Sequence, residues 1–394
     1  MRLNFVDRRP GEGHSMKFSR YAGALVAAVM MTATAPVAYA GPFAFPDLVG
    51  PYPSDLPARV NYISVLDGFT ELRESRPDVV QQNLDTAVAI NNAASPVEQQ
   101  RALFDSHYDR LLSLSDGLGH RLGEVFRVAL DEGRLPKTET LLGGDLARAG
   151  GIANSTLVEK QHWNNPRPFE AAPERIHYYF GDGTGGAADP YAEVFGTSSY
   201  PSGHTAQAYW KGILLADMLP ELAPQILARA SEVGHSRIVL GVHYPLDVMG
   251  ARIMGQAAAA DRLNDPAFVR LVDEAKDELR SELERSVGAP LADYIESDVR
   301  YRSLDAARGE YRERMTYGFE PVDPAMVNDI PADAAVLLRS VAPHLTDEER
   351  LGVLRDTALP AGYPLDCAGP AGGWLRIDLA AAYASVLDVS QAGT

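Results

Sequence analysis

The sequence predicts an all-α protein. Apolar residues recur at helical spacing between residues 78 and 132. Three more helical runs cover residues 205–219, 222–240 and 245–263, and they follow a polar, glycine-rich stretch at 181–200 that is the longest expected loop. The sequence has no series of alternating apolar and polar segments and no internal repeat, so helices packed on helices are the expected architecture.

Proline and glycine mark where the expected helices begin and end. Gly133 and Pro136 end the first helical series, and Pro245 stands at the first position of the run 245–263, where a proline costs no hydrogen bond. Residues 42–58 contain five prolines and predict an extended leader. Residues 267–317 are strongly charged and amphipathic, which predicts one or two surface helices.

Large apolar residues within the run 205–219 recur at helical spacing, which favours core packing over a cofactor site. Two aromatic residues outside this run, Trp163 and Tyr200, fit either a pocket wall or the core. The residues expected in the core are Tyr209, Trp210, Ile213, Leu214 and Met218.

The 394-residue chain is acidic, with 53 Asp and Glu residues against 36 Lys and Arg, a net charge of −17 and a pI near 5.0. A general nucleic-acid binder or a protein bound to an anionic membrane needs a broad cationic face, and the charge argues against both classes. A small cationic pocket remains compatible with this net negative charge. The single cysteine, Cys367, excludes an intrachain disulfide and a cysteine-based zinc cluster.

The N-terminus predicts export. Lys17 and Arg20 precede an apolar run, which is followed by the small-residue sequence AYA at residues 38–40. This order of basic, apolar and small-residue parts is typical of a secretory signal peptide, and the apolar run is short for a membrane-spanning helix. We expect cleavage after Ala40 and a periplasmic or secreted protein without a membrane span. Met16 is an alternative start of translation.

Three short clusters, KQHWNNPRP, SSYPSGHT and SRIVLGVHYPLD, concentrate polar residues in a fixed order. The first cluster is a weak signal by itself, whereas the second and third have four fixed positions each and are specific. All three in this order make coincidence a poor explanation. The candidate site residues are Lys160 and Arg167 in the first cluster, Ser202, Gly203 and His204 in the second, and Arg237, His243 and Asp247 in the third.

The cations of these clusters predict an anion site in an otherwise acidic protein. The planar forks of Arg167 and Arg237 suit a tetrahedral oxyanion, and Lys160 adds a point charge. Ser202 and Gly203 precede a helix that is expected to open near residue 204 or 205. Their N–H groups can therefore point at the anion alongside the positive end of the helix dipole.

The two histidines predict covalent phosphoryl transfer. His243 is followed at i+4 by Asp247, a carboxylate that can hold the imidazole in one tautomer and stabilise the cation formed on phosphorylation. His204 is then left to protonate the leaving oxygen. Together with the cations and the glycine turn, the histidines describe phosphoryl transfer through a phosphohistidine.

KQHWNNPRP, PSGH and SRIVLGVHYPLD resemble the three-part signature of the type 2 phosphatidic acid phosphatase superfamily. SYPSGHT and the expected signal peptide are similar to its soluble bacterial class A non-specific acid phosphatases. The segment DGLGHRLGEVFRVALDEGRLPKT extends the likeness to roughly residues 95–262. Ser198 departs from the class A pattern, which usually has glycine at this position.

This resemblance implies a helical bundle of the soluble acid phosphatase and vanadium haloperoxidase type. It implies broad hydrolysis of phosphate monoesters, with no metal or other cofactor. His243 is then the nucleophile, His204 the acid and Asp247 the partner of His243. The phosphate-binding residues that the resemblance implies are Lys160, Arg167, Ser202, Gly203 and Arg237.

The expected organisation is a signal peptide at 1–40, a helical phosphatase domain at 41–265 and a helical C-terminal extension at 266–394. Small-molecule phosphomonoesters are the expected partners. No binding of nucleic acid is expected, and the sequence is compatible with a homo-oligomer.

Three rival functions remain open. A vanadium-dependent haloperoxidase, which resembles this superfamily, would hold vanadate in the same pocket, although the 31 residues between His204 and Ser236 are typical of the phosphatases. A lipid phosphate phosphatase normally has several membrane spans. A periplasmic phosphate-binding protein would need the cations and the glycine turn, but not two histidines and Asp247.

Overall fold

The computed structural model describes residues 41–44, 47, 61–107, 110–143, 156–180 and 189–392. The expected signal peptide and most of the expected leader lie outside these residues. The described residues belong to one compact unit, Gly41–Thr394. Within them helices are joined by turns and loops, no β-strand is present, and the all-α prediction is confirmed.

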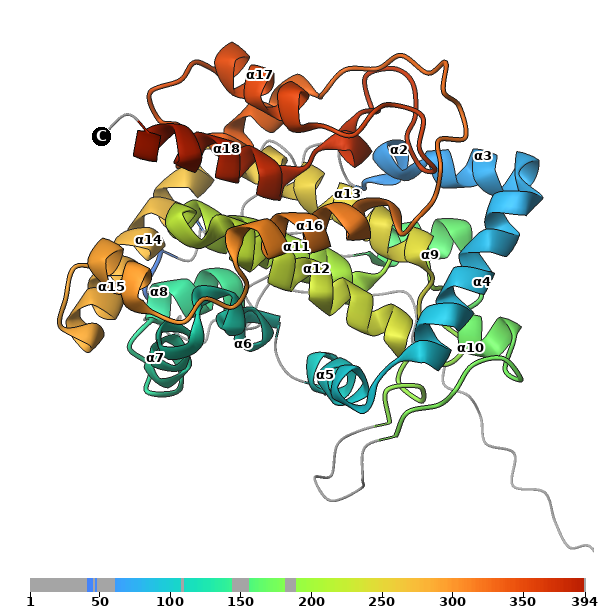
Figure 1. The fold of residues 1–394 in the computed structure, drawn as a ribbon, viewed down its shortest axis with the longest axis horizontal. Helices are drawn as coiled ribbons and strands as arrows, with labels where there is room; N and C mark the ends of the chain where they lie inside the picture. The colour runs from blue at the N-terminus through green and yellow to red at the C-terminus, as the bar shows by residue number, and fades with distance from the viewer. Residues whose placement is uncertain are drawn as a thin grey trace, which may run out of the picture. The chain divides into compact units, whose positions relative to one another are not determined.

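The described α-helices run from α2 to α18, and Figure 1 labels each of them. The N-terminal helices are α2 (Ile63–Leu66), α3 (Gly68–Ser75), α4 (Pro77–Ala93), α5 (Pro96–His107), α6 (Arg110–Leu114), α7 (His120–Asp131) and α8 (Pro136–Thr138). The middle helices are α9 (Leu157–Trp163), α10 (Pro168–Ala171), α11 (Gly203–Met218), α12 (Ala223–Val239) and α13 (Pro245–Leu263). The C-terminal helices are α14 (Pro266–Val287), α15 (Leu291–Ser297), α16 (Leu304–Thr316), α17 (Asp347–Thr357) and α18 (Leu379–Ala392).

Helices α11, α12 and α13 form the centre of the hydrophobic core, and α11 packs against both of the others. Nearly every side chain of α13 is buried, and α11 buries residues around most of its circumference. A helix that is apolar on all sides is stable only when neighbours cover all sides. The five residues of the run 205–219 that were predicted for the core are each at most 1% exposed, so this prediction is confirmed.

The central helices begin and end close to the predicted positions. Helix α13 covers Pro245–Leu263, as predicted, because Pro245 is compatible with the first helical position. Helix α11 begins two residues earlier than predicted, at Gly203. The reason is the cap: the Ser202 side chain accepts a hydrogen bond from the N–H of Thr205 and so satisfies one of the open donors of the first turn.

The charged stretch 267–317 forms most of three helices, α14, α15 and α16, and not one or two. Gly288 ends α14 in the left-handed conformation, with φ 71°, and Pro290 caps the start of α15. The stretch also contributes to the core, because Tyr311 and Met315 of α16 are fully buried and α16 packs on α12. The sequence pattern underestimated this burial because charged residues surround the few apolar positions.

The C-terminal segment packs against the central helices. Arg252 of α13 is buried, and its guanidinium donates to the carbonyl of Leu375 at 2.8 Å and to that of Ile377 at 3.2 Å. Helix α18 packs on α12. The division at residue 265 into a phosphatase domain and an extension stays a prediction. These contacts show that the later segment lies on the helices that carry the sequence motifs.

Trp163 and Tyr200 belong to the core. The Tyr200 ring is fully buried and stacks on Phe69 with 3.8 Å between ring centroids. Trp163 meets the Tyr200 ring edge-on at 4.9 Å, and its indole N–H donates to Thr70 Oγ1 at 3.0 Å. The two rings therefore anchor the motif segments KQHWNNPRP and SSYPSGHT to α3.

Candidate active site

The N-terminus of α11 presents the second motif. Ser202 caps the helix, and its Oγ also accepts a hydrogen bond from Thr205 Oγ1 at 2.8 Å. Gly203 opens the helix in a tight position, since a Cβ there would lie 3.0 Å from Thr156 Oγ1 and 4.0 Å from Lys160 Cε. A glycine thus keeps α9, the first turn of α11 and the positive end of the helix dipole close together.

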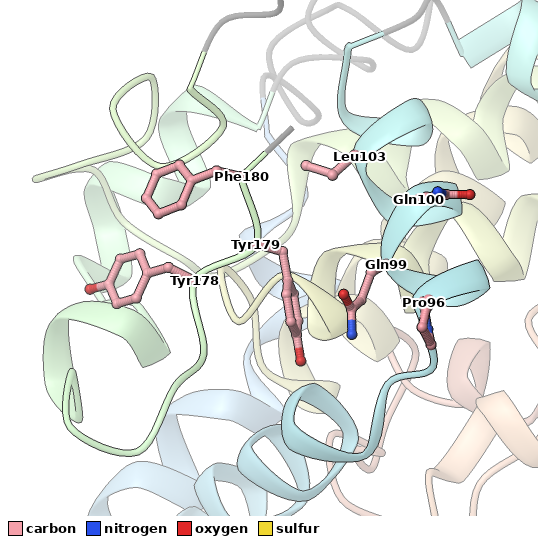
Figure 2. Close-up of a pocket in the computed structure, with 7 residues that line it drawn as sticks. All are labelled: Pro96, Gln99, Gln100, Leu103, Tyr178, Tyr179 and Phe180. Carbon is pink, nitrogen blue, oxygen red and sulfur yellow. The ribbon is translucent and has the colours of Figure 1, made fainter. Parts of the chain in front are cut away.

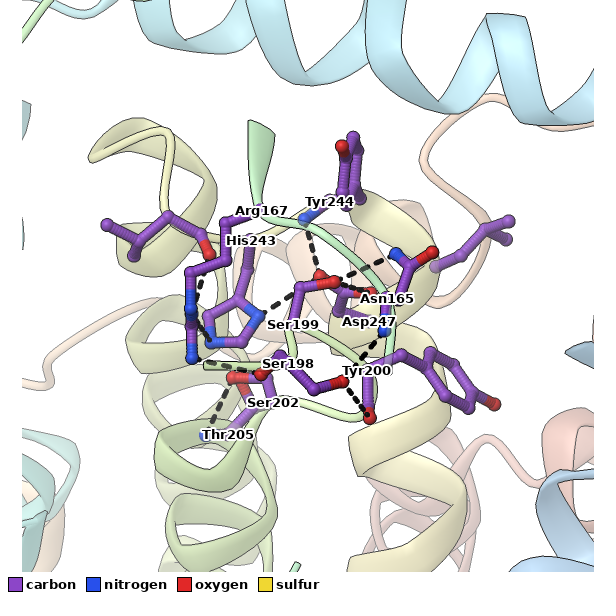
Figure 3. Close-up of polar contacts among 12 residues, drawn as sticks. Asn165, Arg167, Ser198, Ser199, Tyr200, Ser202, Thr205, His243, Tyr244 and Asp247 are labelled. Carbon is purple, nitrogen blue, oxygen red and sulfur yellow. Dashed lines mark hydrogen bonds and ion pairs between the residues drawn. The ribbon is translucent and has the colours of Figure 1, made fainter. Parts of the chain in front are cut away.

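His243 and Asp247 make the predicted contact. His243 Nδ1 lies 3.0 Å from Asp247 Oδ2, and both side chains are buried (Figure 3). The two residues do not share a helix. His243 precedes Tyr244, the cap of α13, and Asp247 turns back from the first turn to accept the Tyr244 N–H at 2.9 Å. The capping geometry of α13 therefore determines the orientation of the imidazole.

Arg167 is held against the imidazole. It precedes α10 and is 3% exposed, and its Nη1 donates to the Val242 carbonyl at 2.8 Å and contacts His243 Nε2 at 3.1 Å. Nη2 donates to Thr197 Oγ1 at 2.9 Å and to the Ser198 carbonyl at 3.1 Å, and Nε donates to the Thr197 carbonyl at 3.1 Å. Because every guanidinium nitrogen has a partner, the fork has one defined orientation.

The partners of the imidazole define its tautomer. An arginine can only donate, so Nε2 of His243 acts as an acceptor. Nδ1 then carries the proton and donates it to the carboxylate of Asp247. The ring is neutral, with its Nε2 lone pair on the side of Arg167.

Lys160 approaches the same loop from α9. Its Nζ donates to the carbonyls of Ser198 at 2.7 Å and Ser199 at 3.2 Å. The Ser198 carbonyl thus accepts from both Lys160 and Arg167. This shared acceptor joins the two cations of the first motif to the loop that leads into Ser202.

Arg237 and His204 complete the group. Arg237 lies in the last turn of α12 and is 1% exposed, while His204 lies half-buried in the first turn of α11. Burial lowers the pKa of His243 most strongly, and the charges of Arg167 and Lys160 lower it further. Arg237 and His204 act in the same direction. The fold therefore brings all eight candidate residues of the three motifs together.

The site holds more positive charge than its carboxylate balances. Burial, with a further contribution from Arg167, lowers the pKa of Lys160 to about 7. Burial also lowers the pKa of Arg167 to about 10 and raises that of Asp247 to about 6. An anion bound among Lys160, Arg167 and Arg237 would relieve the repulsion between these cations, so the charge distribution fits an anion-binding site.

Comparison with known proteins gives a family match for the part of the chain that carries the three motifs. Residues 141–265, which include all eight candidate residues, match the sequence family described as the PAP2 superfamily. This part of the chain is therefore similar to the PAP2 superfamily. The likeness predicted from the three motifs, to the type 2 phosphatidic acid phosphatase superfamily and its bacterial non-specific acid phosphatases, is thereby confirmed.

Similar proteins include three bacterial acid phosphatases. Over 162 residues the chain is 32% identical to a non-specific acid phosphatase of Providencia stuartii, covering 41% of this chain and 61% of that protein. It is 34% identical over 121 residues to an acid phosphatase of Zymomonas mobilis, covering 30% and 42% of the two chains. It is 36% identical over 81 residues to a non-specific acid phosphatase of Salmonella typhimurium, covering 21% and 32%. The matches thus span 61% or less of these relatives' lengths.

The candidate site also includes residues that the motifs did not mark as candidate site residues. They lie inside or directly beside the motifs, but a serine, threonine or asparagine in a loop is more often a turn former than a site residue. Only their neighbours in space distinguish them. These residues are Asn165, Thr197, Ser198, Ser199 and Tyr244.

A hollow of about 530 Å³ lies between α5 and the segment 178–180 (Figure 2). Its lining has no charged side chain, which distinguishes it from the cation cluster and makes it unsuited to a phosphate group. The lining residues are Pro96, Gln99, Gln100, Leu103, Tyr178, Tyr179 and Phe180.

The described residues offer neither a cluster of metal ligands nor a membrane-spanning helix. In the described ranges, no group of three or more His, Cys, Asp or Glu side chains is arranged to hold a metal ion. No helix in the same ranges is long and apolar enough to cross a membrane. Activity without a metal stays a prediction.

Proposed function

We propose that this protein hydrolyses phosphate monoesters through a covalent intermediate on Nε2 of His243. The observation that carries the proposal is the tautomer of the His243 imidazole. Nδ1 donates to Asp247 Oδ2 at 3.0 Å, so Nε2 keeps its lone pair. This lone pair lies beside the guanidinium of Arg167. A nitrogen lone pair directed into a cluster of cations is a nucleophile placed where a phosphate group binds. The relatives named acid phosphatases support the proposal.

In the first step, Nε2 of His243 attacks phosphorus and the bond from phosphorus to the ester oxygen breaks. The phosphoryl group takes the position at Nε2 that Arg167 Nη1 now occupies, and Nη1 donates to a phosphate oxygen instead. His204 gives its proton to the leaving oxygen, so that an alcohol departs. Asp247 stabilises the positive charge that the imidazole ring acquires.

In the second step, water attacks the phosphorus of the phosphohistidine and the N–P bond breaks. His204, which lost its proton in the first step, now takes one from the water. Inorganic phosphate leaves, and the neutral imidazole of His243 is restored. In both steps Lys160, Arg167 and Arg237 stabilise the charge on the equatorial oxygens, together with the N–H groups at the start of α11.

Hydrolysis of p-nitrophenyl phosphate in excess EDTA tests the proposal. We expect turnover by the natural protein, because three cations supply the charge stabilisation that a metal ion gives elsewhere. His243→Ala should abolish it for every substrate, and His344→Ala, at an exposed position of the C-terminal segment, should leave it unchanged. Activity that vanishes in EDTA and returns with one specific divalent ion would overturn the mechanism.

Chemical trapping tests the intermediate. Rapid quenching with labelled substrate should give a protein adduct that is stable in base and labile in acid, as expected for an N–P bond. The adduct should be absent from His243→Ala. Bound vanadium and halide oxidation, without phosphatase activity, would instead favour the haloperoxidase.

We also propose that the protein is exported by its N-terminal segment. The support is the order of basic, apolar and small residues before residue 41. Fractionation of a bacterial host, followed by N-terminal sequencing, should find a mature protein that begins at Gly41 in the periplasm or medium. A full-length chain in the cytoplasm would contradict this.

A further inference from the structure

A chain of hydrogen bonds reaches Oδ1 of Asp247, whereas His243 contacts Oδ2. Asn165 Nδ2 donates to Ser199 Oγ at 2.9 Å, and Ser199 Oγ donates to Asp247 Oδ1 at 3.3 Å (Figure 3). The direction of this chain is determined by its ends. An amide nitrogen can only donate and an ionised carboxylate can only accept, so the single hydroxyl proton of Ser199 must point to Asp247.

Asn165 is also bound to the serine loop through its backbone. Its N–H donates to Ser198 Oγ at 3.0 Å, and its carbonyl accepts the N–H of Ser199 at 2.8 Å. Three contacts therefore join the segment that carries Arg167 to the segment that leads into Ser202. The amide of Asn165 has little freedom to turn away from Ser199.

Asp247 depends on such donors because it is fully buried. Oδ2 accepts from His243 Nδ1 and from the N–H of Tyr244, whereas Ser199 donates to Oδ1. The charged groups that face the carboxylate are Lys160 on α9 and Arg167 before α10, and both favour its ionised form. Without the hydroxyl of Ser199, Oδ1 would lose a donor inside a site that excludes water, which is costly for a charged oxygen.

We propose that Asn165 and Ser199 are positioning residues that keep the Asp247 carboxylate ionised and aimed at Nδ1 of His243. They touch neither phosphate nor leaving group, and they act on the nucleophile only through Asp247. The proposal rests on the proposed function for its kinetic consequence, and on the hydrogen bonds alone for its effect on the imidazole.

The first test removes the hydroxyl. Ser199→Ala should lower kcat for p-nitrophenyl phosphate by about tenfold or more, the usual effect of losing a hydrogen bond to a charged group. KM should change less than about twofold, because the phosphate-binding cations are untouched. The acid limb of the pH profile should move to higher pH, because the hydrogen bond from Ser199 lowers the pKa of Asp247. Ser113→Ala, at another fully buried serine, is the control.

The second test removes the hydrogen-bond donor of Asn165 and keeps the shape of the side chain. Asn165→Asp replaces the amide by a carboxylate, which cannot donate to Ser199 Oγ when ionised and repels Asp247. We expect a lower kcat and a larger shift of the acid limb than in Ser199→Ala. Asn164→Asp adds the same charge at the neighbouring, exposed position. It should neither lower kcat nor shift the acid limb.

Two measurements separate a positioning role from a merely structural one. Adding Ser199→Ala to Asp247→Asn should lower kcat by less than about twofold, because Ser199 acts only through the group already replaced. The Nδ1–H signal of His243 in proton NMR, assigned by its loss in His243→Ala, should broaden or disappear in Ser199→Ala and persist in Ser113→Ala.

The outcomes distinguish this inference from the proposed function. Fully additive losses in the double variant, or an unchanged acid limb and an unchanged Nδ1–H signal in Ser199→Ala, overturn the positioning role while turnover by the natural protein stands. A natural protein that forms no phosphohistidine and hydrolyses no monoester overturns the proposed function. In that case the NMR signal alone still decides whether Ser199 controls the imidazole.

Discussion

Nη1 of Arg167 lies 3.1 Å from Nε2 of His243. The guanidinium cannot accept a hydrogen bond, so this contact requires an unprotonated Nε2. Burial and the charge of Arg167 both lower the pKa of His243, which favours the same neutral form. In the proposed mechanism, Arg167 therefore has two roles: it binds the phosphate, and it keeps the nucleophile unprotonated before the substrate arrives. Thr197 and Ser198 make this possible because they hold Nη2 of Arg167.

The role of His204 depends on the leaving group. His204→Ala should reduce hydrolysis of an alkyl phosphate by about 100-fold or more, because general acid catalysis contributes that much when a poor leaving group needs a proton. Hydrolysis of p-nitrophenyl phosphate should fall far less, because its leaving group is stable as an anion. Rates of both substrates are to be measured at one pH. Equal proportional losses would remove the assigned acid role.

Lys160 should set the alkaline limit of activity. Its pKa is lowered to about 7, mainly by burial, so the side chain is charged below that pH and neutral above it. Loss of the charge should weaken phosphate binding, so kcat/KM should fall as the pH rises through about 7. Lys160→Arg retains a charge at alkaline pH and should move this limb upward by one unit or more. Because the same substrate is used for both proteins, ionisation of the substrate affects the two pH profiles alike. If the alkaline limbs of the two proteins coincide, the assignment to Lys160 is wrong.

Vanadate should inhibit much more tightly than inorganic phosphate, by about 100-fold or more. It readily adopts the five-coordinate geometry of in-line attack and can accept Nε2 of His243 at its apex. Arg237→Lys keeps a charge but loses the fork, so it should weaken vanadate about tenfold more than phosphate. Competitive inhibition constants for both anions check this. If both weaken alike, the pocket is an ordinary anion site rather than one complementary to the transition state.

Gly241 should be indispensable for the segment that carries His243. Its φ is +67°, and a Cβ there would collide with the side chain of Ile176. Gly241→Ala should lower the free energy of unfolding by about 2 kcal/mol or more, from the left-handed backbone and the overpacking together. Gly133→Ala is the matched control, because Gly133 has φ +65° and nothing within 4 Å of its Cβ position.

Denaturant unfolding of both glycine variants gives the comparison. In Gly133→Ala the free energy of unfolding should fall only by the cost of the left-handed backbone conformation, about 1 kcal/mol. Equal losses in the two variants would mean that the contact with Ile176 relaxes freely. A lowered kcat in Gly241→Ala, with no change in Gly133→Ala, is expected because Gly241 lies two residues before His243.

The sequence by itself determined what depends on neighbours along the chain. The helical class follows from apolar spacing, and α13 starts at Pro245 because proline suits a first helical position. Asp247 could be paired with His243 because they are four residues apart. The eight candidate residues could be named from three short motifs, although their catalytic roles stay predictions.

The tertiary structure decided what depends on residues far apart in the sequence. Asn165, Ser199 and Asp247 form one chain of hydrogen bonds only because segments 34 and 48 residues apart meet, and no local pattern marks the meeting point. Likewise Tyr200 belongs to the core because Phe69 stacks on it. A hydrogen bond or a ring contact depends on position in space, whereas composition and periodicity report only the order of residues along the chain.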